Sequence, residues 1–331
     1  MELFLSILFF LFKIFIIIGS IYLIMLLFSS KKESGLELTV MTFRERYSSD
    51  QMRVLQKTVA KNLWKTFKKI INKEKLDKRD SSLYVIEFVG DMKSSQTDSL
   101  KEMVTILATI VKKKDEVLVI MNSPGGQVHQ YGYAASQLVR LRDRCQLTVA
   151  IDRIGASGGY LMACVAHQIL AAPFAIVGSI GVIGQVPNIN KLLKKNLIDI
   201  EEHTAGAYKR SLSIVGENTP EKIDRFKYEL EQTHLLFQNF VKEYRPIVHD
   251  DALLSGEHFY AAQSLEHYKL VDKIITSDEY ILDATAHKNV VYLKTAPKVS
   301  WISRFVAVSQ SIVEASVESL SSLKQILLRK E

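Results

Sequence analysis

Residues 147–170 read LTVAIDRIGASGGYLMACVAHQIL, and this stretch determines the class of fold that the sequence predicts. The β-branched and apolar residues of 147–152 predict a strand. The small residues GASGG follow at 155–159 and predict a tight turn. The apolar residues after the turn, YLMACVAHQIL, predict a helix over 160–170. A strand that leads through a glycine-rich turn into a helix is typical of an α/β fold.

Two similar units precede this stretch. Residues 83–90 (LYVIEFVG) predict a strand, and a helix follows with apolar residues three, four and seven positions apart, ending near Val111. Residues 116–121 (EVLVIM) are typical of a strand covered on both faces, and NSPGG at 122–126 predicts a turn before a helix to about Leu141. This alternation implies parallel strands, so both glycine-rich turns are expected at the carboxyl ends of neighbouring strands, where sites usually form.

A long scaffold helix is predicted further along the chain. Thr219 is a favourable N-cap, Pro220 suits the first helical position, and the helix is expected to end at about Arg245 because Pro246 follows. Its apolar residues predict one buried face: Ile223, Phe226, Leu230, Phe237 and Val241. Residues 301–329 predict an amphipathic C-terminal helix for oligomer or membrane contact.

Composition excludes several classes of protein. A chain of 331 residues with 47% hydrophobic and 24% charged residues is not disordered. Cys145 and Cys164 are too few for a disulfide framework or a cysteine-rich zinc site, although their pairing stays open. The net charge of +7 lies in residues 31–80, which hold 14 Lys and Arg against seven Asp and Glu. Because this surplus has no aromatic platform or recognised module beside it, nucleic-acid binding is not expected.

The first 30 residues predict a membrane anchor. Residues 3–28 read LFLSILFFLFKIFIIIGSIYLIMLLF with Lys13 as their single charge, and about 20 such residues cross a bilayer core. A cleavable signal peptide would have a basic start, a shorter apolar run and a small-residue cleavage site. Few globular cores hold a helix this long that is apolar on nearly all sides, so we expect an uncleaved anchor.

The charges after the anchor leave its orientation open. Lys31, Lys32 and further basic residues follow the span closely, which favours a cytoplasmic body, although this rule weakens before a large domain. Residues 44–79 hold twelve basic residues with apolar residues at helical spacing. They predict a basic amphipathic helix, and a membrane-surface helix and a solvated helix face explain them equally well.

Ser157 is the candidate nucleophile, because it lies among glycines at a strand-to-helix turn. Small neighbours would expose its hydroxyl, and the amides at the start of the next helix would favour negative charge there. The successive glycines Gly125 and Gly126 could present amides that form an oxyanion hole with the amide of Gly158. The alternative is a plain glycine-rich turn with a capping serine.

A serine nucleophile needs a general base, and the residues alone leave it open. His129, His167, His203 and His234 are candidates for a triad, whereas Lys209 is the candidate for a dyad. A free lysine has a pKa of about 10.4, so a lysine can serve as a base only where burial lowers its pKa by several units.

Four stretches of this chain resemble the signal peptide peptidase A family of Ser-Lys peptidases. They are NSPGG, VAIDRIGASGGYLMACVAHQI, APFAIVGSIGVIGQ and HTAGAYKRSLSIVGENT. The likeness covers roughly residues 83–280, includes the N-terminal anchor, and is greatest to a type of probable inner-membrane protease of proteobacteria.

The resemblance implies a role for each matching residue. Ser157 matches the nucleophile, Lys209 the general base, and Ser179 the residue whose hydroxyl orients the lysine. Gly125, Gly126 and Gly158 match the oxyanion-hole region.

The resemblance also implies an architecture and partners. It implies a Clp protease/crotonase-like fold of repeated ββα units with an N-terminal transmembrane helix, assembled as a homo-oligomer. Hydrophobic or signal-peptide-like peptides are the implied substrates, without a cofactor or metal. The implied location is the bacterial inner membrane, with a periplasmic body. Four parts are expected: an anchor (1–30), a basic juxtamembrane segment (31–80), a peptidase domain (81–280) and a C-terminal extension (281–331).

Three other functions fit part of the pattern. GASGG matches the GxSxG motif of α/β-hydrolase esterases, but the HGGG-type oxyanion motif is missing. A crotonase-type acyl-CoA enzyme would share the oxyanion geometry but would not need Ser157 or a membrane span. A non-catalytic membrane scaffold is disfavoured because Ser157, Ser179 and Lys209 are all present.

Overall fold

The computed structural model describes residues 36–43, 45–47, 79–206, 209 and 211–297. These residues fall into two compact units, residues 39–294 and the short described ends 36–38 and 295–297. The predicted anchor over residues 1–30, most of the basic segment and the C-terminal helix over 301–329 lie outside the described residues. No helix in the described part of the chain has the length and hydrophobicity needed to cross a membrane.

Strands and helices alternate along the chain, as the sequence predicted. The described strands are β1 (Leu36–Thr42), β2 (Ser82–Val89), β3 (Glu116–Ser123), β4 (Gln146–Ala156), β5 (Gln168–Ala171), β6 (Ile176–Gly178), β7 (His258–Tyr260), β8 (Lys273–Ile274) and β9 (Asn289–Pro297). The described helices are α4 (Thr97–Ile110), α5 (Val128–Arg142), α6 (Gly158–Ala163), α7 (Asn190–Lys195), α8 (Pro220–Tyr244), α9 (Asp250–Leu254), α10 (Ala261–Glu266) and α11 (Ser277–Ala284).

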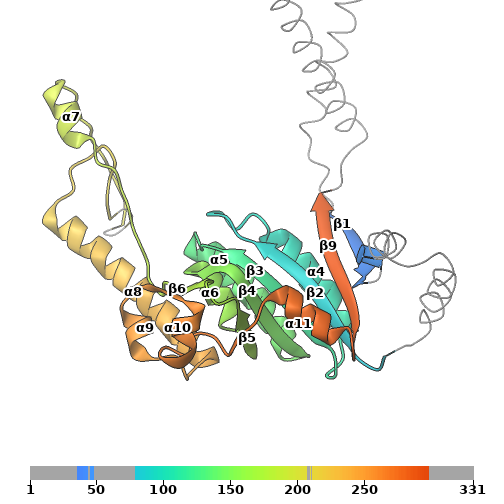
Figure 1. Cartoon of the computed structure of the whole chain (residues 1–331). Helices are drawn as coiled ribbons and strands as arrows, with labels where there is room; N and C mark the ends of the chain where they lie inside the picture. The colour runs from blue at the N-terminus through green and yellow to red at the C-terminus, as the bar shows by residue number, and fades with distance from the viewer. Residues whose placement is uncertain (1–35, 44, 48–78, 207–208, 210, 298–331) are drawn as a thin grey trace, which may run out of the picture. The chain divides into compact units, whose positions relative to one another are not determined.

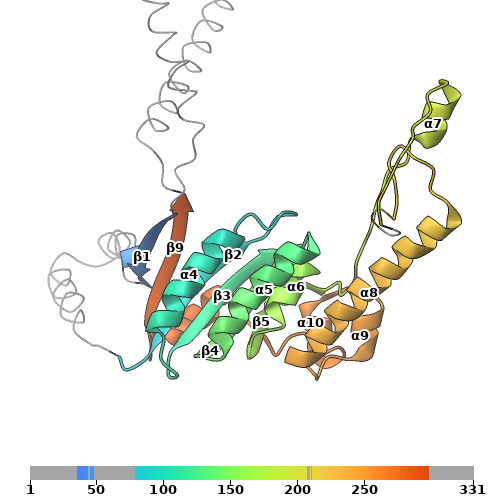
Figure 2. The ribbon, with the colours of Figure 1, turned by 180° about the vertical axis from the view of Figure 1, so that it is seen from behind.

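The described strands form one sheet in the order β1-β9-β2-β3-β4-β5-β8, and β6 pairs with both β4 and β7. The central pairs β2–β3, β3–β4 and β4–β5 are parallel, so the α/β class and the parallel pairing are confirmed. Figures 1 and 2 show α4 and α5 on one face of the sheet and α11 on the other. β3 is almost wholly buried, as expected of a strand with both faces covered.

The predicted helix over residues 160–170 is wrong in its second half. α6 ends at Ala163, and Gln168–Ala171 form strand β5 beside β4. Local periodicity could not distinguish a helix from a strand here, because a short apolar run such as Ile169–Leu170, which is buried, suits both. The deciding contact comes from far along the chain, where the carboxylate of Asp272 accepts a hydrogen bond from the backbone N–H of Ile169 at 2.6 Å.

Helix α8 begins after its N-cap Thr219 and ends before Arg245, as predicted. Its predicted buried face is only partly correct, because Phe237 and Val241 are buried whereas Ile223 is 39% exposed. The N-terminal half of α8 therefore has little of the core against it. Both cysteines are buried free thiols, which answers the question of their pairing.

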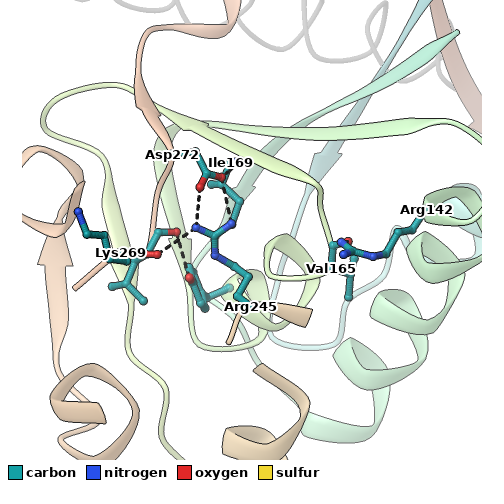
Figure 3. A network of polar contacts seen from close by, with 8 residues as sticks. Arg142, Val165, Ile169, Arg245, Lys269 and Asp272 are labelled. Atoms are coloured by element: carbon teal, nitrogen blue, oxygen red, sulfur yellow. Dashed lines mark hydrogen bonds and ion pairs between the residues drawn. The ribbon is translucent and has the colours of Figure 1, made fainter. Parts of the chain in front are cut away.

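An ion pair between the buried Arg245 and the partly exposed Asp272 fixes the C-terminal end of α8 to the sheet (Figure 3). Arg245 is 4% exposed and donates two hydrogen bonds of 3.0 Å to the carboxylate of Asp272, and a third to the carbonyl of Lys269. The hydroxyl of Tyr160, on α6, donates to the neighbouring carbonyl of Leu270 at 3.0 Å. This network joins α8, β5 and α6, the helix that directly follows Ser157.

Asp272→Asn should lower the free energy of unfolding by roughly 3 kcal/mol, because it leaves the Arg245 charge buried without a compensating anion. The matched control is Asp250→Asn, since Asp250 pairs with Lys242 where both side chains are largely exposed. That change should lower the free energy of unfolding by less than about 1 kcal/mol. Urea unfolding followed by circular dichroism measures both, and equal losses would contradict the structural role of the Arg245–Asp272 pair.

Candidate active site

Ser157 connects the carboxyl end of β4 to the first residue of α6. Its backbone has φ 51° and ψ −120°, a left-handed conformation that residues other than glycine rarely adopt. Two hydrogen bonds hold it there: its N–H donates to the carbonyl of Gly178 at 2.8 Å, and its carbonyl accepts from Leu161 at 2.9 Å. The serine is partly exposed between buried neighbours, so its hydroxyl is accessible at a fixed backbone position.

The turn that follows β3 makes a close approach to Ser157. Gly125 has φ 91°, and a Cβ atom on it would lie 2.6 Å from the Gly158 nitrogen and 2.7 Å from the Ser157 Cβ. Only glycine fits this position, because any larger residue would collide with the serine turn. The structure thus brings Gly125, Gly158 and Ser157 together, as the sequence predicted for neighbouring strand ends.

The backbone amides of Gly125, Gly126 and Gly158 differ in whether they already have a hydrogen-bond acceptor. The N–H of Gly125 donates to the side-chain oxygen of Ser123 at 3.1 Å, so it already has an acceptor. Gly158 is the first residue of α6, where the amide has no intrahelical acceptor. Within the described residues the amide of Gly126 has no acceptor either. Gly126 and Gly158 are therefore better placed than Gly125 to bind an oxyanion.

Ser179 lies beside Ser157 and directly follows the last residue of the adjacent strand, β6. Ala156 and Gly178 are register partners in the parallel pair β4–β6, and each serine follows its partner directly. Ser179 has φ 52°, and its N–H donates to the carbonyl of Glu257 at 2.7 Å. Two partly exposed serines with left-handed backbones thus lie at neighbouring strand ends.

Lys209 lies in the long segment between β6 and α8, and its side chain is exposed. The two sides of this segment are joined by hydrogen bonds from Asn188 to the carbonyls of Ser213 and Gly216, with α7 between them (Figure 1). Between described residues, no hydrogen bond or ion pair joins Lys209 to Ser157 or Ser179. The structure brings the two serines together but shows no bond from Lys209 to either of them, so its role stays a prediction.

Among the residues that the structure describes, no hydrogen bond joins any of the four candidate histidines to Ser157. His129 is exposed, and His203 is exposed beside Glu201. His167 accepts a hydrogen bond from the amide of Leu147, at the opposite end of β4 from Ser157, and burial lowers the pKa of its imidazole.

His234 donates its Nε2–H to the carbonyl of Ile180 at 2.8 Å. A ring nitrogen that donates to a carbonyl cannot accept a serine proton at the same time. His234 instead supports the backbone at Ile180, the residue after Ser179. No local sequence signal indicated this contact.

Two comparisons define the family of the chain. Residues 140–291 match peptidase family S49, and residues 2–138 match the N-terminal region of the same family. The "Probable protease SohB" of Buchnera aphidicola subsp. Schlechtendalia chinensis is 42% identical over 295 residues, which cover 82% of this chain and 96% of that protein. The chain belongs to peptidase family S49. It is thus a serine-type peptidase of the SohB kind, and the predicted resemblance is confirmed.

Two other comparisons either cover a smaller share of the matched protein or have a lower sequence identity. The "Probable protease SohB" of Haemophilus influenzae is 46% identical over 230 residues, and the match spans 69% of this chain and 65% of that protein. The solved 1510-N membrane-bound stomatin-specific protease, a mutant in complex with a substrate peptide, aligns over 70% of this S49 chain and 100% of its own. Its TM-score is 0.41 and its sequence identity 14%.

Gly125→Ala should lower kcat/KM for a fluorogenic peptide by about 100-fold or more, because the new Cβ would displace the Gly158 amide. The control is Gly132→Ala on α5, where an added Cβ meets no atom within 4 Å. That change should leave kcat/KM unchanged and stabilise the helix by about 0.5–1 kcal/mol. A Gly125→Ala enzyme with near wild-type turnover would show that this close approach is not needed for catalysis.

Proposed function

We propose that this S49 protein is a membrane-anchored serine endopeptidase that hydrolyses hydrophobic or signal-peptide-like peptides with a Ser157–Lys209 dyad. The observation that carries the proposal is the geometry at the end of β4. There Ser157 is partly exposed, held in a left-handed conformation, and placed against Gly125, Gly158 and the neighbouring Ser179. Backbone strain of this kind concentrates where a side chain must be presented for chemistry.

In the proposed mechanism, the neutral amine of Lys209 takes the proton of Ser157 while the serine oxygen bonds to the peptide carbonyl carbon. The carbonyl electron pair moves onto its oxygen, and the amides of Gly126 and Gly158 stabilise that charge. The protonated lysine then gives its proton to the leaving amine as the peptide bond breaks, leaving an acyl-enzyme. Lys209 next activates water to release the acyl group, and the hydroxyl of Ser179 orients the lysine.

This mechanism requires Lys209 to approach a serine from its exposed position. The segment that carries it begins after β6, where Ser179 directly follows the last residue of the strand, and runs to α8, whose C-terminal end is tied to α6 by the Arg245 network. We propose that assembly of the chain as a homo-oligomer brings this segment over a Ser157 side chain and removes water from the amine. A lysine must lose its hydration to become neutral at ordinary pH.

Ser157→Ala and Lys209→Arg should each abolish labelling by a fluorophosphonate probe. Arginine keeps the positive charge and length of lysine but stays protonated, so it cannot take the serine proton. The control is Lys191→Arg, at an exposed lysine of α7, which should label like wild type. Gel fluorescence of the labelled protein measures all three.

Two further experiments test the identity of the base and the copy of the chain that supplies it. Labelling that survives Lys209→Ala but is lost in His203→Ala or His234→Ala would identify a histidine base. A mixture of Ser157→Ala and Lys209→Ala chains should regain peptidase activity if one copy supplies the lysine to another. No activity in that mixture would place both residues of each site in a single copy.

The membrane anchor rests on the apolar residues 3–28, and the proposed location is the inner membrane with the peptidase body in the periplasm. Deletion of residues 1–30 should release the protein into the soluble fraction, whereas the full chain should remain in membranes after alkaline carbonate extraction. A C-terminal alkaline phosphatase fusion should be active if the body is periplasmic, and inactive if the basic residues after the span keep it in the cytoplasm.

The proposed fold, repeated ββα units as in Clp proteases and crotonases, leaves an acyl-CoA enzyme as the alternative function. An α/β-hydrolase esterase is the second alternative. Cleavage of a hydrophobic peptide library that is lost in Ser157→Ala supports the peptidase. Tight binding of a fluorescent CoA thioester with no peptide cleavage would support the crotonase-type function.

A further inference from the structure

A buried tyrosine lies directly beneath the loops that carry the candidate oxyanion amides. Tyr131, on α5, is 0% exposed. Its hydroxyl donates to the carbonyl of Asp91 at 2.8 Å and lies 2.7 Å from the hydroxyl oxygen of Ser123. The phenol has one proton, and Asp91 accepts it, so the Ser123 hydroxyl must donate to the phenol oxygen. The lone pairs of Ser123 are then free to accept the Gly125 amide at 3.1 Å.

The ring of Tyr131 packs against Gly158, which carries the second candidate oxyanion amide. A Cβ atom on Gly158 would overlap the ring and lie 2.8 Å from the Tyr131 Cβ. A Cβ on Gly90 would overlap both the Ser123 hydroxyl and the phenol oxygen. Gly90 after β2, Ser123 at the end of β3 and Gly158 after β4 therefore all pack around this one side chain, and a Cβ atom on either glycine would collide there.

We propose that Tyr131 and Ser123 are positioning residues that set the oxyanion-binding amides of Gly126 and Gly158. This inference rests on the proposed nucleophilic role of Ser157. The hydroxyl of Tyr131 orients Ser123, Ser123 holds Gly125, and Gly125 fixes the direction of the next amide, that of Gly126. The ring of Tyr131 supports Gly158 from below.

The chemistry of the network suits this role. Burial raises the pKa of Tyr131, so the phenol keeps its proton and the direction of the hydrogen bonds does not change with pH. Removing the phenol oxygen leaves the buried Ser123 hydroxyl without its acceptor, and it must turn toward another group. The Gly125 amide then loses its partner, and the adjacent Gly126 amide can shift. An oxyanion donor acts only when it lies within about 2.7–3.1 Å of the developing charge.

The test compares two inhibitors on the full-length protein. The aldehyde acetyl-Leu-Leu-leucinal accepts the Ser157 oxygen at its carbonyl carbon, the serine proton passes to the base, and the former carbonyl oxygen occupies the oxyanion site. The alcohol acetyl-Leu-Leu-leucinol fills the same peptide subsites but forms no such adduct. The ratio of their inhibition constants therefore measures oxyanion binding, and the alcohol alone measures the peptide subsites.

Wild type should bind the aldehyde about 100-fold or more tightly than the alcohol, and Ser157→Ala should lose this preference. Tyr131→Phe, which keeps the ring on Gly158, should reduce the aldehyde-to-alcohol preference about tenfold and lower kcat by a similar factor. Its KM and its affinity for the alcohol should stay within about twofold of wild type. Ser123→Ala should reproduce these losses, and the double variant should add nothing further. Tyr133→Phe, at an exposed tyrosine of α5, is the matched control and should behave as wild type.

Other outcomes would contradict either the nucleophilic role of Ser157 or the positioning role of Tyr131 and Ser123. No aldehyde preference in wild type, or one that survives Ser157→Ala, removes the proposed nucleophile and this inference with it. A normal wild-type preference that Tyr131→Phe and Ser123→Ala leave unchanged removes only the positioning role. Equal weakening of aldehyde and alcohol in both variants means that the two side chains merely support the fold.

Discussion

The hydrogen bond from the Ser157 amide to the carbonyl of Gly178 holds the rest of the site in relation to the sheet. It keeps a non-glycine residue in a left-handed conformation at the point where β4 becomes α6. Because β4 and β6 are parallel and in register there, the same contact places Ser179 beside Ser157. One backbone contact thus presents the candidate nucleophile and aligns the residue expected to orient its base.

Glycine allows the neighbouring loops to approach this strained residue. Gly125 tolerates a positive φ, and the absence of a Cβ at Gly125 and Gly158 lets the two loops come within van der Waals distance of each other. Tyr131 fills the space beneath both loops, so close packing rather than chain stiffness keeps their amides in place.

The two members of the proposed dyad are held in different ways. Ser157 is supported by the sheet and by α6, which the Tyr160 hydroxyl joins to the segment that holds Asp272 and its partner Arg245. Lys209 lies in a segment outside the sheet, and its side chain is exposed. The proposed dyad therefore joins a residue fixed in the sheet to a residue of a segment that the sheet does not hold.

The sequence by itself determined the α/β class, the parallel strands, the extent of α8 and the position of Ser157 at a glycine-rich strand end. These features follow from local patterns, since apolar periodicity and glycine placement act on the backbone within a few residues. Only the tertiary structure decided that residues 168–171 form a strand, that His234 binds the carbonyl of Ile180, and that the ring of Tyr131 packs against Gly158. Their partners lie up to 103 residues away, as in the bond from Ile169 to Asp272, and nothing in a local pattern specifies contacts that form only when distant elements pack together.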